Sequence, residues 1–312
     1  MASPLLRSPA TSARLGYQRF MFALMGVGAL LVVVPMLFIF GRLLLGGAAQ
    51  LFAPGFWTLP PSNGDKEGGI APQIVGTVAL MVSTIVLALP LGISAAVYLT
   101  EYAGRNALTR AIRMAIVNLA GVPSIVHGLF GLGLFVYFFG AWADYLGGYT
   151  HAHQHIWGRK TLLWGAATLA ILVLPVIITA TEEALKTVPR SFREGALALG
   201  ATKWQTIWRV VLPAALPGIL TGAILAVGRA AGETAPIILT AVVASRVGAG
   251  AVPTLYEAVV ALPYHLYYLV TAVNGASPAL QYGTALTLIL LVFIINLAAI
   301  ILRNRLRKAR KW

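Results

Sequence analysis

The sequence predicts an all-α integral membrane protein with six transmembrane helices, and three observations support this fold class. First, 59% of the 312 residues are hydrophobic and only 10% are charged, whereas a typical soluble domain carries roughly 25% charged residues. Second, the mean hydropathy is +0.83. Third, six apolar stretches reach the roughly 20 helical residues that cross a bilayer core. They do not show the ten-residue alternation of a transmembrane β-barrel.

The six spans follow one another along the chain with loops between them. We place them at residues 21–44, 70–99, 115–140, 161–181, 214–243 and 282–302. Each is longer than the apolar region of a signal peptide, which is about 7–15 residues, so we expect the first span to be retained. Two apolar patches in the last external loop, 252–262 and 266–273, are candidate re-entrant or interfacial helices.

The spans divide the chain into four parts. Residues 1–20 form a cytoplasmic N-terminal arm, which mixes leucine and aromatic residues with arginine and is a candidate interfacial helix. The first transmembrane helix and its external loop occupy 21–69. The other five helices form the core at 70–302, and 303–312 are a basic cytoplasmic tail.

The formal net charge of +14 indicates orientation in such a chain. In a soluble protein a pI of 10.4 would favour nucleic-acid binding. Here 17 of the 23 basic residues lie before span 1, in the loops after spans 2 and 4, and after span 6. By the positive-inside rule these segments face the cytoplasm. We therefore expect a multi-pass protein of the bacterial cytoplasmic (inner) membrane with both termini in the cytoplasm.

The lack of cysteine excludes disulfides and thiolate metal sites.

The cytoplasmic loop at 182–213 carries signals for helix ends. Two residue pairs have the spacing of a capping box, Ser191 with Glu194 and Thr202 with Gln205. Gly200 suits the C-terminus of a helix. The pattern predicts two short helices joined at Gly200, the second ending before Pro213. One face of the second helix would carry Trp204, Ile207, Trp208 and Val211. A well-capped surface loop without a partner is the alternative.

The same loop resembles the EAA loop of ABC importer permeases. The matching residues, whose spacing agrees at every position, are Glu194, Gly195, Ala196, Gly200, Val210, Leu212 and Pro213. Gly195 and Val210 replace the family's alanine and isoleucine. The resemblance implies that these residues couple the chain to a separate cytoplasmic ATPase. The chain has no phosphate-binding loop, so we expect it to bind no cofactor, with ATP and Mg bound by that partner.

Span 5 contains two charged residues. Arg229 and Glu233 are four residues apart, so they share one helix face. Charges inside a membrane usually face a bundle interior or a wet path, and the arginine fork suits phosphate or carboxylate oxygens. This favours an anion path, and the alternative is an ion pair that only locks helices together. Pro236 predicts a kink or break beyond the pair.

Residues 228–236, Gly-Arg-Ala-Ala-Gly-Glu-Thr-Ala-Pro, resemble the fifth-span signature of the PstA family, which are permeases of phosphate importers. Similar matches lie at 70–77, 90–102 and 121–131, and the resemblance covers about 70–305. It implies the MetI-like core of type I ABC importers. The implied substrate path comprises Arg229, Glu233, Thr234 and Ser124. The implied partners are a PstC-like permease subunit, two PstB-like ATPase subunits and a PstS-like periplasmic phosphate-binding protein.

We therefore expect the permease subunit of an ATP-driven importer that moves inorganic phosphate by alternating access, with no catalytic residues and no metal site. Another oxyanion (sulfate, molybdate or phosphonate) is an alternative cargo. A proton-coupled secondary anion carrier, with His127 and Glu233 as a relay, is an alternative mechanism. A buried histidine bonded to a neighbour is the simpler interpretation of His127. The histidines at 151, 153 and 155 have too few fixed partners to indicate a metal site.

Overall fold

The computed structural model describes residues 9–104, 106–149, 155–244 and 252–309, and it describes side chains between residues 14 and 305 of those ranges. Six helices of this part are long and apolar enough to cross a membrane, which confirms the six predicted spans. They comprise Arg14–Leu51, Ala71–Tyr102, Ser124–Leu146, Leu162–Thr187, Lys203–Gly232 and Pro278–Arg305.

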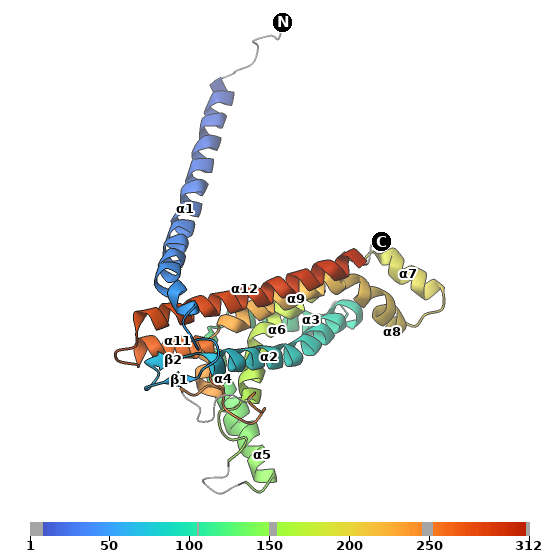
Figure 1. Cartoon of the computed structure of the whole chain (residues 1–312). Helices are drawn as coiled ribbons and strands as arrows, with labels where there is room; N and C mark the ends of the chain where they lie inside the picture. Colours follow the sequence, from blue (N-terminus) through green and yellow to red (C-terminus); the bar gives the residue numbers. More distant parts are fainter. Residues whose placement is uncertain (1–8, 105, 150–154, 245–251, 310–312) are drawn as a thin grey trace.

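The bundle is built around α6 (Leu162–Thr187), the most buried of the spans. It packs on α2 (Ala71–Val97) and on α9 (Leu212–Gly232), and α12 (Pro278–Ala309) packs on α9 in turn. Figure 1 shows these helices running together through the molecule. Thr161 caps α6 by accepting a hydrogen bond from the backbone N–H of Trp164. Small residues at the helix contacts let the backbones approach closely.

Gly222 on α9 illustrates this close packing and gives a testable prediction. A Cβ at Gly222 would lie 2.5 Å from the Cβ of Ala180 on α6, too close for two carbon atoms. Gly222→Ala should therefore lower the melting temperature of the purified chain, since overpacking typically costs 1–3 kcal/mol. Gly41→Ala is the matched control, because a Cβ there meets nothing within 4 Å and alanine favours helix. Equal melting temperatures for the two variants would contradict the predicted contact.

The first helix, α1 (Pro9–Leu51), leaves the bundle at a steep angle (Figure 1). It packs on the start of α12, where Gly46 and Gly47 meet Tyr282. Residues 9–20 continue directly into the first span, so they do not form a separate interfacial helix; residues 1–8 lie outside the described chain. A short hairpin of β1 (Pro61–Ser62) and β2 (Glu67–Gly68) follows in the next loop.

The third predicted span, 115–140, is wrong at its start. The chain forms α3 (Ala107–Ala120), breaks at residues 121–123, and resumes as α4 (Ser124–Gly131), a π-helical stretch (Leu132–Gly140) and α5 (Ala141–Leu146). Pro123 is extended, with ψ 140°, because a proline preceded by glycine and valine does not continue a helix. The apolar sequence runs through the break, so hydropathy alone does not reveal it.

The fifth span breaks near Pro236, as predicted, but three residues earlier. The helix α9 ends at Gly232, Glu233 is extended, and α10 (Ala235–Thr240) follows with Pro236 in its first turn. Beyond it, Val242 bridges Val259. Of the two candidate external helices, 266–273 falls largely in α11 (Leu262–Thr271). The patch at 252–262 is mostly not helical, because its backbone pairs with the segment after α10.

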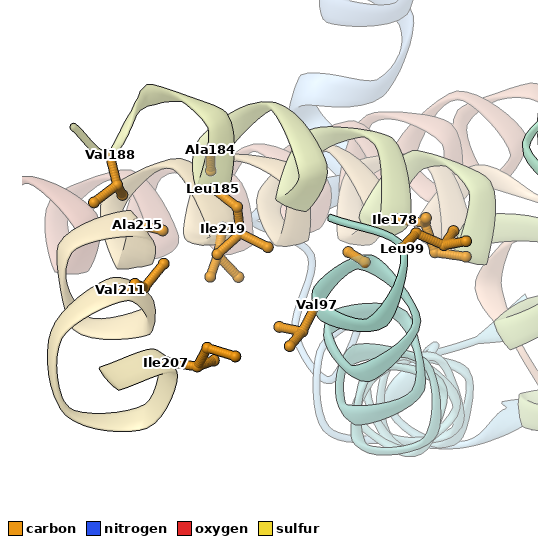
Figure 2. Packing of buried hydrophobic residues seen from close by; sticks show 11 residues of the cluster. Val97, Leu99, Ile178, Ala184, Leu185, Val188, Ile207, Val211, Ala215 and Ile219 are labelled. Atoms are coloured by element: carbon orange, nitrogen blue, oxygen red, sulfur yellow. The ribbon is translucent and has the colours of Figure 1, made fainter. Parts of the chain in front are cut away.

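A buried apolar cluster joins the 182–213 loop to the bundle. Figure 2 shows side chains from α6, from the end of α2 and from the start of α9 converging on it. Ile207 and Val211 come from the loop itself and are 2% and 0% exposed. Burying such side chains contributes about 1.5–3 kcal/mol each, so this part of the loop is fixed to the bundle.

Candidate functional site

Arg229 and Glu233 lie at the point where α9 ends. The Nε of Arg229 is 3.6 Å from Oε1 of Glu233, and the two side chains are 34% and 20% exposed. This is an ion pair too long for a hydrogen bond. Within the described part of the chain the Arg229 guanidinium has no hydrogen-bond partner. Its N–H donors are therefore available to another group.

The contacts of α9 with α6 place Arg229 near the middle of the bundle. Gly218 meets Ala184 and Gly222 meets Ala180, so the two helices run antiparallel. In the same register, Ala226 and Ala230 of α9 belong to one buried cluster with Val173 of α6. Val173 lies near the centre of α6. Arg229 is thus about as far from one end of α6 as from the other.

Arg229 lies on a partly exposed face of α9, between the residues that contact α6 and α12 on one side and Leu225 on the other. Leu225, one turn earlier on α9, is 60% exposed, and Gly232 is also exposed. By contrast, Gly228 meets Asn296 of α12. The stripe of Leu225, Arg229 and Gly232 is therefore a surface that this chain leaves partly uncovered. An arginine there, paired only with Glu233 of its own helix, usually faces the bundle interior or a water-filled cavity in a membrane protein.

Ser124 and Thr234 belong to two segments that pack on each other, α4 and the start of α10. A Cβ at Gly128 would lie 2.8 Å from Cα of Pro236, and Ser124 is one helical turn before Gly128. Thr234 directly precedes α10, and its side chain makes no capping bond. Both residues are half-buried. No hydrogen bond joins either one to Arg229 or Glu233 among the described residues.

His127 is buried, with 4% of its surface exposed. Its Nδ1 lies 3.3 Å from the carbonyl oxygen of Pro123, which agrees with a histidine bonded to a neighbour. Its Nε2 is buried and has no hydrogen-bond partner among the described residues. No chain of hydrogen bonds in the described residues connects it to Glu233, so a relay between the two has no structural support.

The elbow in the 182–213 loop forms as predicted at Gly200. The helix α7 (Arg190–Ala198) ends in a Schellman motif: Gly200 N–H bonds to the Leu197 carbonyl and Ala201 N–H to the Ala196 carbonyl. Gly200 has φ +84°, which glycine adopts at little cost. The capping box of Thr202 and Gln205 opens α8 (Lys203–Thr206). Glu194, Gly195 and Gly200 are exposed, and Ala196 is half-buried.

Two predicted helix ends in this loop are wrong. The first capping box is not formed, because α7 starts two residues earlier, with Pro189 at the N-cap and Ser191 inside the helix. The second helix does not end before Pro213. It continues through a π-helical turn, Ile207–Val211, into α9, and this wider turn accommodates a proline that lacks an N–H.

The four residues predicted to share one face occupy two. Ile207 and Val211 are buried, whereas Trp204 and Trp208 are 58% and 54% exposed. The two tryptophan rings pack edge to face, with 5.4 Å between their centroids. The wider π-helical turn changes the angle between successive side chains, which separates the two pairs. Val210, Leu212 and Pro213 are half-buried in the entry to α9, so the matching residues of the loop divide between an exposed elbow and a packed helix.

Arg193 is a functional candidate that the sequence did not single out. Its Nη2 is 2.8 Å from Oε1 of Glu101, and its side chain also donates to the carbonyls of Leu185 and Val188. Arg193 is 20% exposed and Glu101 11%. This arginine ties α7 to the ends of α2 and α6. A second tie, from Arg113 of α3 to Glu182 of α6, lies nearby.

On the opposite side of the bundle, Asp144 holds the loop after α5. The carboxylate is 1% exposed and accepts backbone N–H bonds from Ile156, Trp157 and Gly158. The Nδ1 of His155 lies 3.2 Å from it. His151 and His153 lie outside the described residues.

A family model described as "Binding-protein-dependent transport system inner membrane component" matches residues 88–311. This segment contains the elbow at Gly200 and the break after Arg229. The chain belongs to this family. It is therefore a multi-pass transport permease with the ABC importer permease fold.

Curated relatives of this permease span most of its length. One is the "Phosphate transport system permease protein PstA 1" of Mycobacterium tuberculosis, 34% identical over 87% of this chain and 83% of that protein. Another is the "Probable ABC transporter permease protein YqgI" of Bacillus subtilis, 32% identical over 69% of this chain and 67% of that protein.

Solved structures resemble the permease in fold. A bacterial ABC transporter for import of the acidic polysaccharide alginate gives a TM-score of 0.64 at 15% identity, covering 95% of this chain and 98% of that one. The MetNI methionine transporter gives 0.52 at 20% identity, covering 76% of this chain and 94% of that one. At these identities the likeness concerns the fold alone.

Proposed function

We propose that this chain is the permease subunit of an ATP-driven importer that carries inorganic phosphate across the cytoplasmic membrane. One observation carries the proposal. Arg229 sits near the centre of the bundle, on a partly exposed face of α9, with N–H donors that hydrogen-bond to no described side chain. A guanidinium in this position can bind phosphate oxygens as a planar fork.

The choice of phosphate rests on the relatives, which include several phosphate transport permeases. Glu233, 3.6 Å from Arg229, holds the guanidinium in place and can accept a hydrogen bond from a protonated oxyanion. Ser124 and Thr234 supply hydroxyl groups beside the break in α9. Non-helical backbone is tolerated at membrane depth where it lines a wet cavity, which agrees with a path at this break.

The partners follow from the same family. A PstC-like permease subunit would cover the stripe of Leu225, Arg229 and Gly232, so that phosphate passes between two subunits. A PstS-like periplasmic protein would deliver phosphate. Two PstB-like ATPases, which bind ATP and Mg, would contact the exposed elbow at Glu194–Gly200 from the cytoplasm. Both termini lie in the cytoplasm in this arrangement, as the basic loops indicate.

Coupling would work by hinge motion. When the ATPases close, they pull the elbow, and α7 transmits the pull to α2 and α6 through Arg193. The continuous helix from α8 through the π-helical turn into α9 transmits the same motion toward Arg229. The site would then open outward, receive phosphate, and open inward after hydrolysis.

Substitutions at Gly200 test whether the bend of the elbow is needed for coupling to the ATPase. Because a Cβ there meets nothing within 4 Å, only the backbone conformation opposes a side chain. Gly200→Val should lower ATP-driven uptake several-fold, since a left-handed conformation costs an ordinary residue roughly 1–2 kcal/mol and a β-branched one more. Gly200→Asn should retain most uptake, because asparagine tolerates this conformation. If valine transports as well as glycine, the bend has no role in coupling.

Purification of the tagged chain from its native membrane tests the proposed assembly. We expect a second permease subunit and an ATPase to co-purify with it in a mild detergent, and protein mass spectrometry would identify them. Recovery of the chain alone, from membranes that actively import phosphate through it, would contradict the proposal and favour a secondary carrier.

A further inference from the structure

A second cluster of positive side chains lies far from Arg229, around a cavity of about 840 Å³. The walls come from the end of α2, the start of α3, the end of α6 and the start of α7. Five lining side chains are cationic: Arg110, Arg113, Lys186, Arg190 and Arg193. The volume falls within the roughly 300–1,000 Å³ of small-molecule sites. The cavity opens at the end of the bundle where the basic loops gather.

Three of these five cations are already neutralised. Arg193 pairs with Glu101, Arg113 pairs with Glu182, and Lys186 lies 2.6 Å from Glu183 and 3.9 Å from Glu182. These pairs fix the walls of the cavity.

The other two, Arg110 on α3 and Arg190 on α7, are exposed and make no hydrogen bond or ion pair within the described residues. Five positive groups thus face three carboxylates, and the excess charge rests on Arg110 and Arg190.

The uncharged lining of the cavity is also polar in part. Asn106 and Thr109, at the start of α3, line it beside the arginines. Polar side chains beside two free guanidinium forks suit an oxyanion with several acceptor oxygens.

We propose that this cavity binds a phosphate group at the cytoplasmic surface of the membrane, separately from the transport path. Two sources carry that chemistry. One is the headgroup of an anionic phospholipid, which basic pockets between transmembrane helices bind on this side. The other is free inorganic phosphate, which in an importer accumulates on this side. Because α3 and α7 both contribute an unpaired arginine, a bound phosphate bridges them and stabilises the position of the elbow relative to the bundle.

The test uses the assembled transporter in nanodiscs of phosphatidylcholine, with Arg229→Ala in every sample so that the transport path does not contribute. The probes are radiolabelled inorganic phosphate and short-chain phosphatidylglycerol, each titrated alone and against the other. Arg110→Gln combined with Arg190→Gln removes the two free cations. Arg14→Gln combined with Arg305→Gln is the matched control, because both are exposed arginines outside the cavity. Sites on other subunits contribute equally to all samples.

We expect the cavity variant to bind at least one probe about twentyfold to thirtyfold more weakly, since each arginine near an anionic surface contributes a factor of about five. The control should bind normally. Loss of phosphatidylglycerol alone identifies a lipid headgroup, loss of inorganic phosphate alone identifies the free ion, and loss of both with mutual competition identifies one shared site. Unchanged binding in the cavity variant, or equal weakening in the control, overturns the proposal. In that case an acidic segment of the ATPase would be a better candidate for the cavity.

Discussion

Replacing Arg229 with alanine should abolish phosphate uptake while the transporter still assembles. The guanidinium is the charged group nearest the centre of the described bundle on a partly exposed face, and loss of a bidentate, charge-assisted contact is expected to reduce transport at least about 100-fold. Assembly should survive, because a partly exposed ion pair at 3.6 Å contributes little to stability. Arg229→Lys should retain partial uptake, because lysine keeps the charge but not the fork.

The double variant Arg229→Ala with Glu233→Ala separates the anion path from a helix-locking ion pair. If the pair only locks helices, removing both charges relieves the unpaired glutamate and restores uptake relative to the single variant. If Arg229 binds the anion, the double variant remains inactive. Initial rates of radiolabelled phosphate uptake, normalised to the amount of assembled transporter, distinguish these results. Normal uptake by the single variant would exclude Arg229 from the path.

Replacing Arg193 with methionine should uncouple ATP hydrolysis from transport. The arginine makes two contacts with Glu101 and bonds the carbonyls of Leu185 and Val188. Removing it leaves a carboxylate that is only 11% exposed without its partner. Loss of one member of a fully buried pair costs 3–5 kcal/mol, and partial exposure reduces that to about 2 kcal/mol. We expect uptake at least tenfold lower with ATP hydrolysis no longer stimulated by the binding protein.

Arg209→Met is the matched control for Arg193. It removes a positive charge from the same loop, but Arg209 is exposed and makes no ion pair within the described residues. Uptake and stimulated ATP hydrolysis should stay near the unsubstituted level. If Arg209→Met and Arg193→Met behave alike, the charge of the loop, rather than the tie from α7 to α2, accounts for the coupling.

Local signals in the sequence predicted the six membrane spans, the bend at Gly200 and the break in span 5 near Pro236. Runs of apolar residues located all six membrane helices, since burial in lipid depends on composition over about 20 residues. Gly200 located the elbow, because few residues adopt φ +84° without strain. Pro236 located the break in span 5 to within three residues. Each of these features depends on residues within a turn or two of one another.

The errors have equally physical causes. The break before α4 lies inside an apolar run, so hydropathy passes through it, and only Pro123 gives a sign of it. The π-helical turn before Pro213 changes the helical period, which moved Trp204 and Trp208 away from the buried face. The pair of Arg193 with Glu101 joins residues 92 apart in sequence. Such a contact depends on how three helix ends meet, and no local pattern encodes it.

Transport by the purified, assembled complex in proteoliposomes tests the central claim most directly. With ATP inside the vesicles and the binding protein and radiolabelled phosphate outside, we predict ATP-dependent accumulation of phosphate that sulfate, molybdate and phosphonate at equal concentration do not reduce. Strong competition by another oxyanion would contradict phosphate as the cargo. Accumulation driven by a pH gradient, in vesicles that contain this chain without any ATPase, would contradict ATP-driven transport.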